Sequence, residues 1–121
     1  QINLPGAQGN LTFPLYSGFI HFDIADARHE IFYVLCESIR SNPLDSPLIV
    51  WFNGGPGSSS LIGFLLEHGP YIIEDDSGSL RYNDFSWNQY ANVLYIESPA
   101  NAGFSNSNKS IKWYDDKSTA K

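Results

Sequence analysis

Hydrophobic and polar positions along the chain predict strands first and a helix later. Residues 15–23 and 31–38 are rich in aromatic and aliphatic side chains, and the link Ala25-Asp26-Ala27 lies between the two runs. Two β-rich runs joined by so short a link favour an antiparallel hairpin. The next apolar run, residues 48–52, contains no polar position. A continuous apolar run of this length is typical of a strand that is buried on both faces.

A helix is predicted over residues 58–68. Its apolar side chains, from Leu61 to Leu66, follow three serines that can cap a helix, and Gly69-Pro70 ends it. The remaining predicted elements are short: an irregular arm over 1–14, an extended piece over 71–73, a turn over 75–78, a strand over 92–96, a turn over 99–103, a polar tail over 105–112 and a helical first turn over 115–120.

This order of elements predicts an α/β fold. Two sheet strands joined by a helix form a crossover connection, which is right-handed almost without exception. A complete doubly wound domain needs far more chain than 121 residues. We therefore expect residues 1–121 to form the opening segment of one domain, a mixed sheet with flanking helices that is incomplete in this chain. The first residue is Gln1, so we expect a processed or trimmed product.

Composition and charge exclude several classes of protein. A hydrophobic content of 42% and an aromatic content of 15% indicate a folded chain. The formal net charge is −6 and no run of basic residues occurs, which argues against a nucleic-acid partner. No apolar run approaches the roughly 20 residues of a membrane-spanning helix. Cys36 is the one cysteine, so it is expected to be a buried small hydrophobe or, less favoured, to pair with a cysteine of another segment.

The segment after the apolar run 48–52 carries the most informative chemistry. Asn53-Gly54-Gly55-Pro56-Gly57 interrupts the apolar pattern and is followed by serines. This predicts a sharp turn with free backbone N–H groups, which can stabilise negative charge on a carbonyl oxygen during a reaction. Two alternatives are a purely structural strand-to-helix turn and a phosphate-binding loop. A phosphate-binding loop would need a lysine after the glycines, and none is present.

Seven motifs in order resemble the serine carboxypeptidases, a family with the α/β-hydrolase fold. They are Leu4-Pro5-Gly6, Tyr16-Ser17-Gly18-Phe19, Phe32-Tyr33 with Glu37-Ser38, Pro47 to Gly57, Glu67-His68-Gly69-Pro70, Asn83 with Ser86-Trp87-Asn88, and Glu97 to Ser105. Three features depart from the family pattern. Ser58 replaces a cysteine, Asn106 replaces a tyrosine, and the nucleophile motif Gly-Glu-Ser-Tyr-Ala-Gly is missing. The nearest relative of that motif, residues 103–107, lacks its last glycine and is predicted to be a turn.

The resemblance implies a role for each residue of the glycine turn. The N–H group of Gly55 would donate one hydrogen bond to the oxyanion, and the residue after the missing serine would donate the second. Asn53, Gly54 and Glu67 would bind the terminal carboxylate of a peptide, and the alternative for Glu67 is a water-exposed residue at the end of the helix. Glu67 can bind a carboxylate only when it is protonated, because like charges repel, which favours acidic pH. Trp51 is expected to pack in the core and to form part of the floor of the site.

The function implied by this resemblance is that of a serine-type carboxypeptidase, of which the chain would be the N-terminal portion. The enzyme would remove C-terminal residues from peptides at acidic pH through an acyl-enzyme. Its partners would be a peptide with a free C-terminal carboxylate and the remainder of the protein, or a second processed chain, carrying the catalytic Ser, Asp and His. Two alternatives stay open: a truncated, non-catalytic family member with a binding or structural role, and an acyltransferase of the same family.

The expectations about cellular location, cofactors and metals rest on a few residues. Asn10 and Asn108 begin glycosylation sequons, which fits a lysosomal, vacuolar or secreted protein. No cofactor is expected. His21, His29 and His68 are too scattered for a metal site, and His68 is expected to lie on the surface at the end of the helix.

Overall fold

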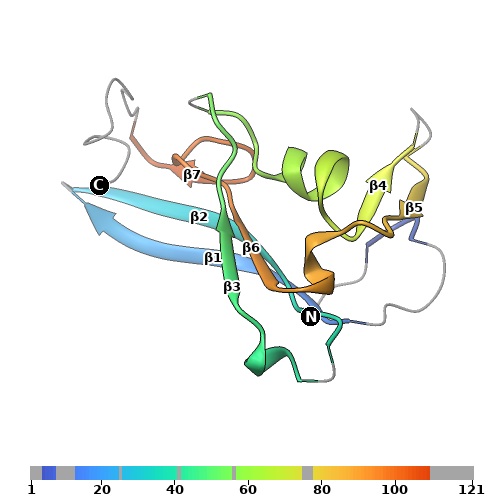
Figure 1. The fold of residues 1–121 in the computed structure, drawn as a ribbon. Coiled ribbons are helices and arrows are strands. Elements are labelled where there is room, and N and C mark those ends of the chain that lie inside the picture. Colours follow the sequence, from blue (N-terminus) through green and yellow to red (C-terminus); the bar gives the residue numbers. More distant parts are fainter. Residues whose placement is uncertain are drawn as a thin grey trace.

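The computed structural model describes residues 4–7, 13–24, 26–40, 42–55, 57–74 and 78–109. These residues form two sheets with short helical turns between them (Figure 1). The strands are β1 (Leu15–Ile24), β2 (Ala27–Cys36), β3 (Leu48–Trp51), β4 (Tyr71–Ile73), β5 (Leu80–Tyr82), β6 (Asn92–Ile96) and β7 (Asn106–Ser107). The helical turns are η1 (Pro43–Asp45), η2 (Gly63–Glu67) and η3 (Trp87–Gln89).

The larger sheet has the strand order β1-β2-β6-β3, and β7 pairs with the start of β2. The predicted hairpin is confirmed, since β1 and β2 are antiparallel from the Leu15–Cys36 pair to the Ile24–Ala27 pair. β6 runs antiparallel to β2 and parallel to β3. The sheet is therefore mixed, as predicted, and its two parallel strands are joined through the helical segment. The strand predicted over 92–96 is also confirmed.

β3 differs from its prediction. Leu48 is 58% exposed and Val50 is 45% exposed, while Ile49 and Trp51 pack against the core. The expectation of burial on both faces was wrong for the described chain. β3 pairs with β6 on one side and has packing on one face, so its alternate side chains remain in solvent.

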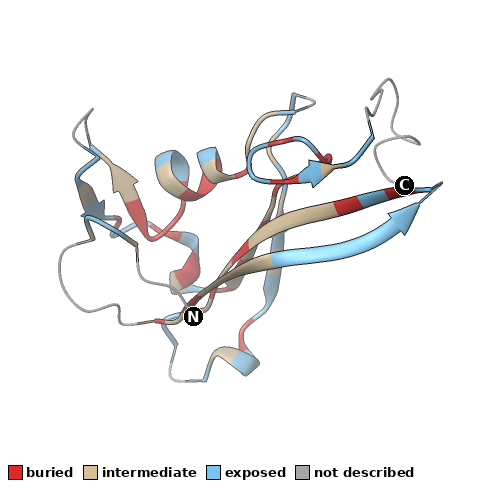
Figure 2. Ribbon diagram, turned by 180° about the vertical axis from the view of Figure 1, so that it is seen from behind, coloured by how far each residue is buried: buried red, intermediate tan, exposed pale blue. Residues whose placement is uncertain are grey.

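The core lies between the large sheet and the helical segment. It is one cluster to which β1, β2, β4, β6 and η2 all contribute, with the buried residues red in Figure 2. The cluster contains Phe13, Leu15, Val34, Cys36, Phe64, Tyr71, Val93 and Tyr95. Cys36 is fully buried, which confirms the expected small hydrophobe, and burial raises the pKa of its thiol well above the usual range.

The helix begins later and winds wider than predicted. Helical structure starts at Leu61 rather than at 58, and η2 is a π-helix. Its width is visible at the end, where the N–H groups of His68 and Gly69 both donate to the carbonyl of Gly63, at 3.0 and 3.2 Å. Among the three serines, Ser59 accepts a hydrogen bond from the N–H of Leu61 at 3.1 Å and so acts as a cap.

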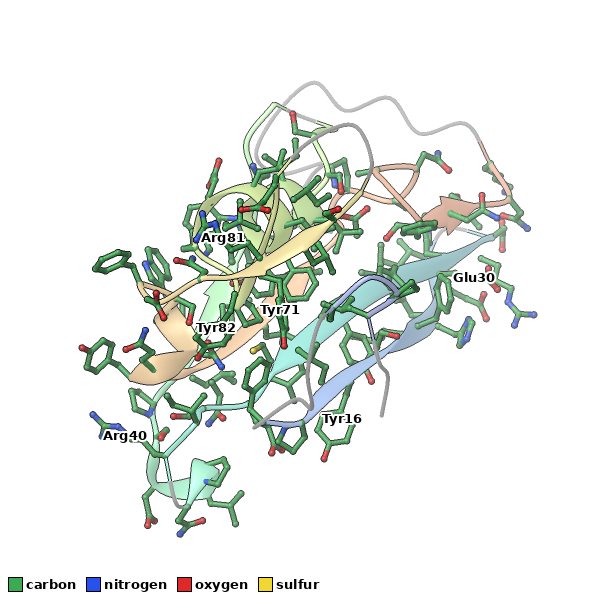
Figure 3. All side chains as sticks on the ribbon, turned by 90° about the vertical axis from the view of Figure 1, so that its right-hand side faces the viewer. Tyr16, Glu30, Arg40, Tyr71, Arg81 and Tyr82 are labelled. Carbon is green, nitrogen blue, oxygen red and sulfur yellow. The ribbon has the colours of Figure 1, made fainter. Side chains whose placement is uncertain are left out.

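A small antiparallel hairpin of β4 and β5 follows the helical segment. Tyr71 and Tyr82 face each other across it with ring centroids 5.8 Å apart (Figure 3). Arg81 Nε pairs with Glu74 Oε1 at 2.9 Å. The predicted short extended piece over 71–73 is thus a strand. The predicted turn over 75–78 lies mostly, and the predicted helical turn over 115–120 wholly, outside the described residues.

Candidate functional site

Two loops meet at one end of the large sheet. One follows β3 and carries the glycine turn, and the other follows β6 and includes residues 97–105. Because β3 and β6 are parallel, both loops leave the sheet at the same edge (Figure 1). Carboxyl ends of parallel strands are the usual ligand-binding edge of open α/β sheets. The structure therefore places the predicted site residues 53–55 at a suitable edge.

Gly55 occupies a backbone conformation that a side chain would strain. Its φ angle is +143°, and a Cβ atom there would lie 2.9 Å from the nitrogen of Gly57 and 3.0 Å from that of Ser58. Gly54 and Gly55 are both exposed, and their N–H groups meet no acceptor within the described part of the chain. The turn thus presents unpaired donors to solvent, which is the property that an oxyanion site requires.

Asn53 is held from two directions. Its backbone N–H donates to Ser60 Oγ at 3.1 Å. Its side-chain Oδ1 accepts hydrogen bonds from Trp51 Nε1 at 2.6 Å and from the N–H of Gly63 at 3.3 Å. The acceptor end of the carboxamide is therefore occupied. The Nδ2 group remains as a donor, and a carboxylate ligand can only accept.

His68 is buried, so its predicted surface position was wrong. Its ring stacks on Trp87 with centroids 3.9 Å apart, and Trp51 meets it edge-on at 4.4 Å. Its Nδ1 lies 3.1 Å from the hydroxyl oxygen of Tyr95. Burial lowers the pKa of His68, and the nearby Glu67 carboxylate opposes this in part. The imidazole lies inside the protein because packing against these rings buries apolar surface that would be exposed if His68 lay at the surface.

Glu67 lies at the rim of this aromatic cluster. Its side chain is 46% exposed, and Oε2 is 3.9 Å from His68 Nε2, a buried nitrogen that has no hydrogen-bond partner in the described chain. Asn53 touches the same cluster through Trp51, and Glu67 touches it through His68. The rings of Trp51 and His68 therefore connect the two side chains predicted to bind a carboxylate, and the packing predicted for Trp51 agrees with this position.

Sequence reasoning missed three contributors to this region, His68, Trp87 and Glu97. His68 and Trp87 stand inside motifs that had been noted, but their stacking joins positions 19 residues apart and leaves no local pattern. Glu97 is 1% exposed and accepts hydrogen bonds from both loops. Glu97 opens one of the seven motifs, but its hydrogen bonds to Ser59 and Phe104 form only in the folded chain.

The structure describes two other positions that the sequence analysis named. Ser105 is buried, donates to the carbonyl of Glu97 at 2.6 Å and accepts from the N–H of Phe32 at 2.8 Å. Residues 103 and 104 lie in a turn, as predicted, whereas Asn106 and Ser107 of the same segment form β7. Asn108 is exposed, and its Oδ1 accepts from the N–H of Arg28 at 2.9 Å, whereas Asn10 lies outside the described residues.

The described residues offer no metal site and no membrane-spanning element. No group of three His, Cys, Asp or Glu side chains among them is arranged to hold a metal ion. No helix in this part of the chain is both long enough and apolar enough to cross a bilayer.

Comparison with known proteins decides the family. The profile described as "Serine carboxypeptidase" matches residues 5–121. This chain belongs to the serine carboxypeptidase family. Lysosomal protective protein of Mus musculus is 49% identical over 102 residues, which are 84% of this chain and 21% of that protein. Serine carboxypeptidase ctsa-3.1 of Caenorhabditis elegans is 48% identical over 103 residues, 85% of this chain and 18% of the relative. The resemblance inferred from the seven motifs is thereby confirmed.

A solved structure supports the fold assignment. The chain resembles the crystal structure of Kex1(delta)p, a prohormone-processing carboxypeptidase from Saccharomyces cerevisiae, with a TM-score of 0.68 and 36% identity. The match covers 78% of this chain and 21% of that chain. The predicted partial α/β sheet is thus confirmed. The chain spans about a fifth of the length of the relatives it matches.

Proposed function

We propose that residues 1–121 are the N-terminal segment of one domain of a serine-type carboxypeptidase. The enzyme hydrolyses C-terminal residues from peptides at acidic pH through an acyl-enzyme. The catalytic Ser, Asp and His belong to the remainder of the same protein or to a second processed chain. Membership of the family and the exposed glycine turn at the carboxyl end of β3 support this proposal.

The single observation that carries the proposal is the exposed Gly55, whose N–H meets no acceptor among the described residues. When a nucleophile attacks a peptide carbonyl, the oxygen gains a negative charge that needs donors already in place. Gly55 supplies one donor from a turn whose geometry excludes a side chain. The backbone N–H after the nucleophile supplies the second donor. Removing one such donor typically slows catalysis by about 10²- to 10³-fold.

Carboxylate binding makes this enzyme an exopeptidase. Asn53 donates through Nδ2, Gly54 donates through its backbone N–H, and Glu67 donates when its carboxyl group is protonated. The bonds from Trp51 and Gly63 to Asn53 Oδ1 support this role, because they orient the amide before a peptide arrives. A protonated Glu67 avoids the repulsion between two carboxylates, so binding is strongest at acidic pH.

Location in the secretory pathway, in a lysosome, a vacuole or the extracellular space, completes the proposal. The relative named lysosomal protective protein supports it. So do the sequons at Asn10 and Asn108, of which Asn108 is exposed. We propose that both asparagines carry glycans.

The test uses the full-length protein that contains this chain. An N-blocked dipeptide with a free C-terminal carboxylate is compared with its C-terminal amide between about pH 4.5 and pH 7, and a fluorophosphonate probe reports a reactive serine. The proposal expects labelling by the probe and faster cleavage of the free acid. Labelling together with transfer to an alcohol acceptor instead of water would identify an acyltransferase. Neither labelling nor turnover would identify a non-catalytic family member.

A further inference from the structure

Glu97 is a buried carboxylate that joins the two loops of the site. It directly follows β6, and its residue surface is 1% exposed. Oε1 accepts hydrogen bonds from Ser59 Oγ at 2.6 Å and from the N–H of Leu61 at 3.2 Å. Oε2 accepts from the N–H of Phe104 at 2.9 Å. One side chain therefore contacts the segment that carries the glycine turn and the loop that follows β6.

The hydrogen-bond partners at this position require a side chain that only accepts, and among side chains of this size only a carboxylate does so. All three partners donate, and an ionised carboxyl group has acceptors only. Its 2.6 Å contact with Ser59 falls in the range of charge-assisted O–H···O⁻ bonds. A glutamine would fill the same volume but would place an NH₂ group against a donor on one of its two sides.

A second pair of bonds fastens the glycine segment to the same strand. Ser60 Oγ donates to the carbonyl of Ile96 at 2.6 Å and accepts from the N–H of Asn53 at 3.1 Å. Ser59 and Ser60 thus hold two successive residues at the end of β6, Ile96 and Glu97. Gly55 lies inside the loop between these anchors and β3.

Gly103 shows how closely the loop after β6 fits around this carboxylate. A Cβ atom on Gly103 would lie 1.0 Å from Glu97 Oε2 and 2.2 Å from the carboxyl carbon. The space of a side chain at position 103 is therefore taken by the Glu97 carboxyl group. Phe104, the next residue, donates to that same oxygen.

We propose that Glu97 is a positioning residue for catalysis: it fastens the segment 53–61 to the end of β6 and thereby fixes the direction of the Gly55 N–H. The inference rests on the proposed function, in which Gly55 stabilises the oxyanion. Glu97 touches no reacting atom. Its removal lowers the rate of the chemical step. Peptide-carboxylate binding changes much less, because Asn53 is also held by Trp51, Gly63 and Ser60.

The experiment compares wild-type full-length protein with the variant Glu97→Gln, and Glu30→Gln serves as the matched control. Glu30 is a half-exposed carboxylate on β2, and within the described part of the chain its side chain pairs with His21 and Arg28 and with no residue of 53–61 or 97–105. Amide hydrogen exchange is measured for peptides that cover 53–61 and 101–105, and kcat and KM are measured per folded molecule. For E97Q we expect exchange of 53–61 to rise about 10-fold, kcat to fall at least about 10-fold and KM to change less than about 2-fold. E30Q should match wild type.

Two further variants keep the result decisive. Ser59→Ala removes one donor to Glu97, and its effect on kcat should vanish in the E97Q background, because both changes break the same link. If E97Q does not fold, Ser59→Ala alone must raise exchange of 53–61 and lower kcat, or the proposal is overturned.

The outcomes separate this inference from the proposed function. The role of Glu97 is overturned if amide exchange of 53–61 is unchanged in E97Q, or if exchange rises while kcat stays unchanged. In either case an active wild-type protein still supports the proposed carboxypeptidase function. A general loss of stability would lower the folded fraction but leave kcat per folded molecule unaltered. A wild-type protein that hydrolyses no free-acid peptide contradicts the proposed function itself, and the exchange data then still report whether Glu97 holds the segment.

Discussion

Replacing Gly63 by alanine should destabilise this protein, although the same change stabilises most helices. Alanine is favoured over glycine in helices by about 1 kcal/mol. At Gly63, however, the new Cβ would lie 2.4 Å from Trp51 Nε1, 3.0 Å from Cδ1 and 3.1 Å from Cε2. Non-bonded carbon and nitrogen atoms do not approach that closely, so the indole ring must move.

The magnitude follows from what holds Trp51 in place. His68 and Trp87 pack edge-on against the indole with centroids at 4.4 and 5.6 Å, so the ring cannot simply slide away. Overpacking of this kind costs about 1–3 kcal/mol. The lost hydrogen bond from Trp51 to Asn53 adds about 1 kcal/mol. The gain in helix propensity offsets about 1 kcal/mol, which leaves a net destabilisation of about 1–3 kcal/mol.

The assay is urea unfolding of the full-length protein, combined with KM for a free-acid peptide. Because Asn53 loses the bond that orients its amide, KM should rise about 5- to 10-fold, which corresponds to about 1.0–1.4 kcal/mol. Trp51→Phe provides the control background, since phenylalanine lacks the five-membered ring that the new Cβ would strike. Gly63→Ala should cost much less stability there. A Gly63→Ala protein as stable as wild type would refute the packing argument.

Three other substitutions test the remaining parts of the site. Gly55→Ala should lower kcat by about 10²- to 10³-fold in steady-state assays, because the turn cannot hold a Cβ and the oxyanion donor is displaced; a kcat within 3-fold of wild type would argue against the oxyanion role. Burial lowers the pKa of His68, so the unfolded chain takes up a proton below about pH 6.5 while the folded protein resists it. The free energy of unfolding therefore includes a contribution from neutral His68 above that pH, and this contribution is lost as the pH falls. In urea unfolding, the stability of the His68→Phe variant relative to wild type should rise by at most about 1.4 kcal/mol for each pH unit of acidification. A stability difference that does not depend on pH would contradict this. Asn108→Gln should lower the mass of the full-length protein by one glycan, and an unchanged mass would show that the exposed sequon is unused.

Local patterns were sufficient to place β1, β2, β3 and β6 of the large sheet and the glycine turn. The hairpin of β1 and β2 joins residues near one another in the chain, and the strand β6 and the turn around Gly55 each have a local sequence pattern. Alternation of side chains and the backbone freedom of glycine are visible in the sequence without knowledge of distant partners. The family motifs added predictions of which residues form the site.

Tertiary contacts decided the rest. β3 looked like a fully buried strand, but its burial depends on which layers pack against it, and the described chain covers one face. The helix widened into a π-helix where Gly63 meets Trp51, a contact that helical periodicity does not encode. His68 became buried because three aromatic rings from separate segments enclose it.

The sequence by itself determined the family, the mixed sheet and the residue types of the proposed oxyanion and carboxylate sites. Only the tertiary structure decided how those residues are held. The bonds that fasten the glycine segment join Ser59 to Glu97 and Ser60 to Ile96, which are 38 and 36 residues apart. A one-dimensional pattern records neighbours, whereas the direction of a backbone N–H group is set by partners that only the folded chain brings together.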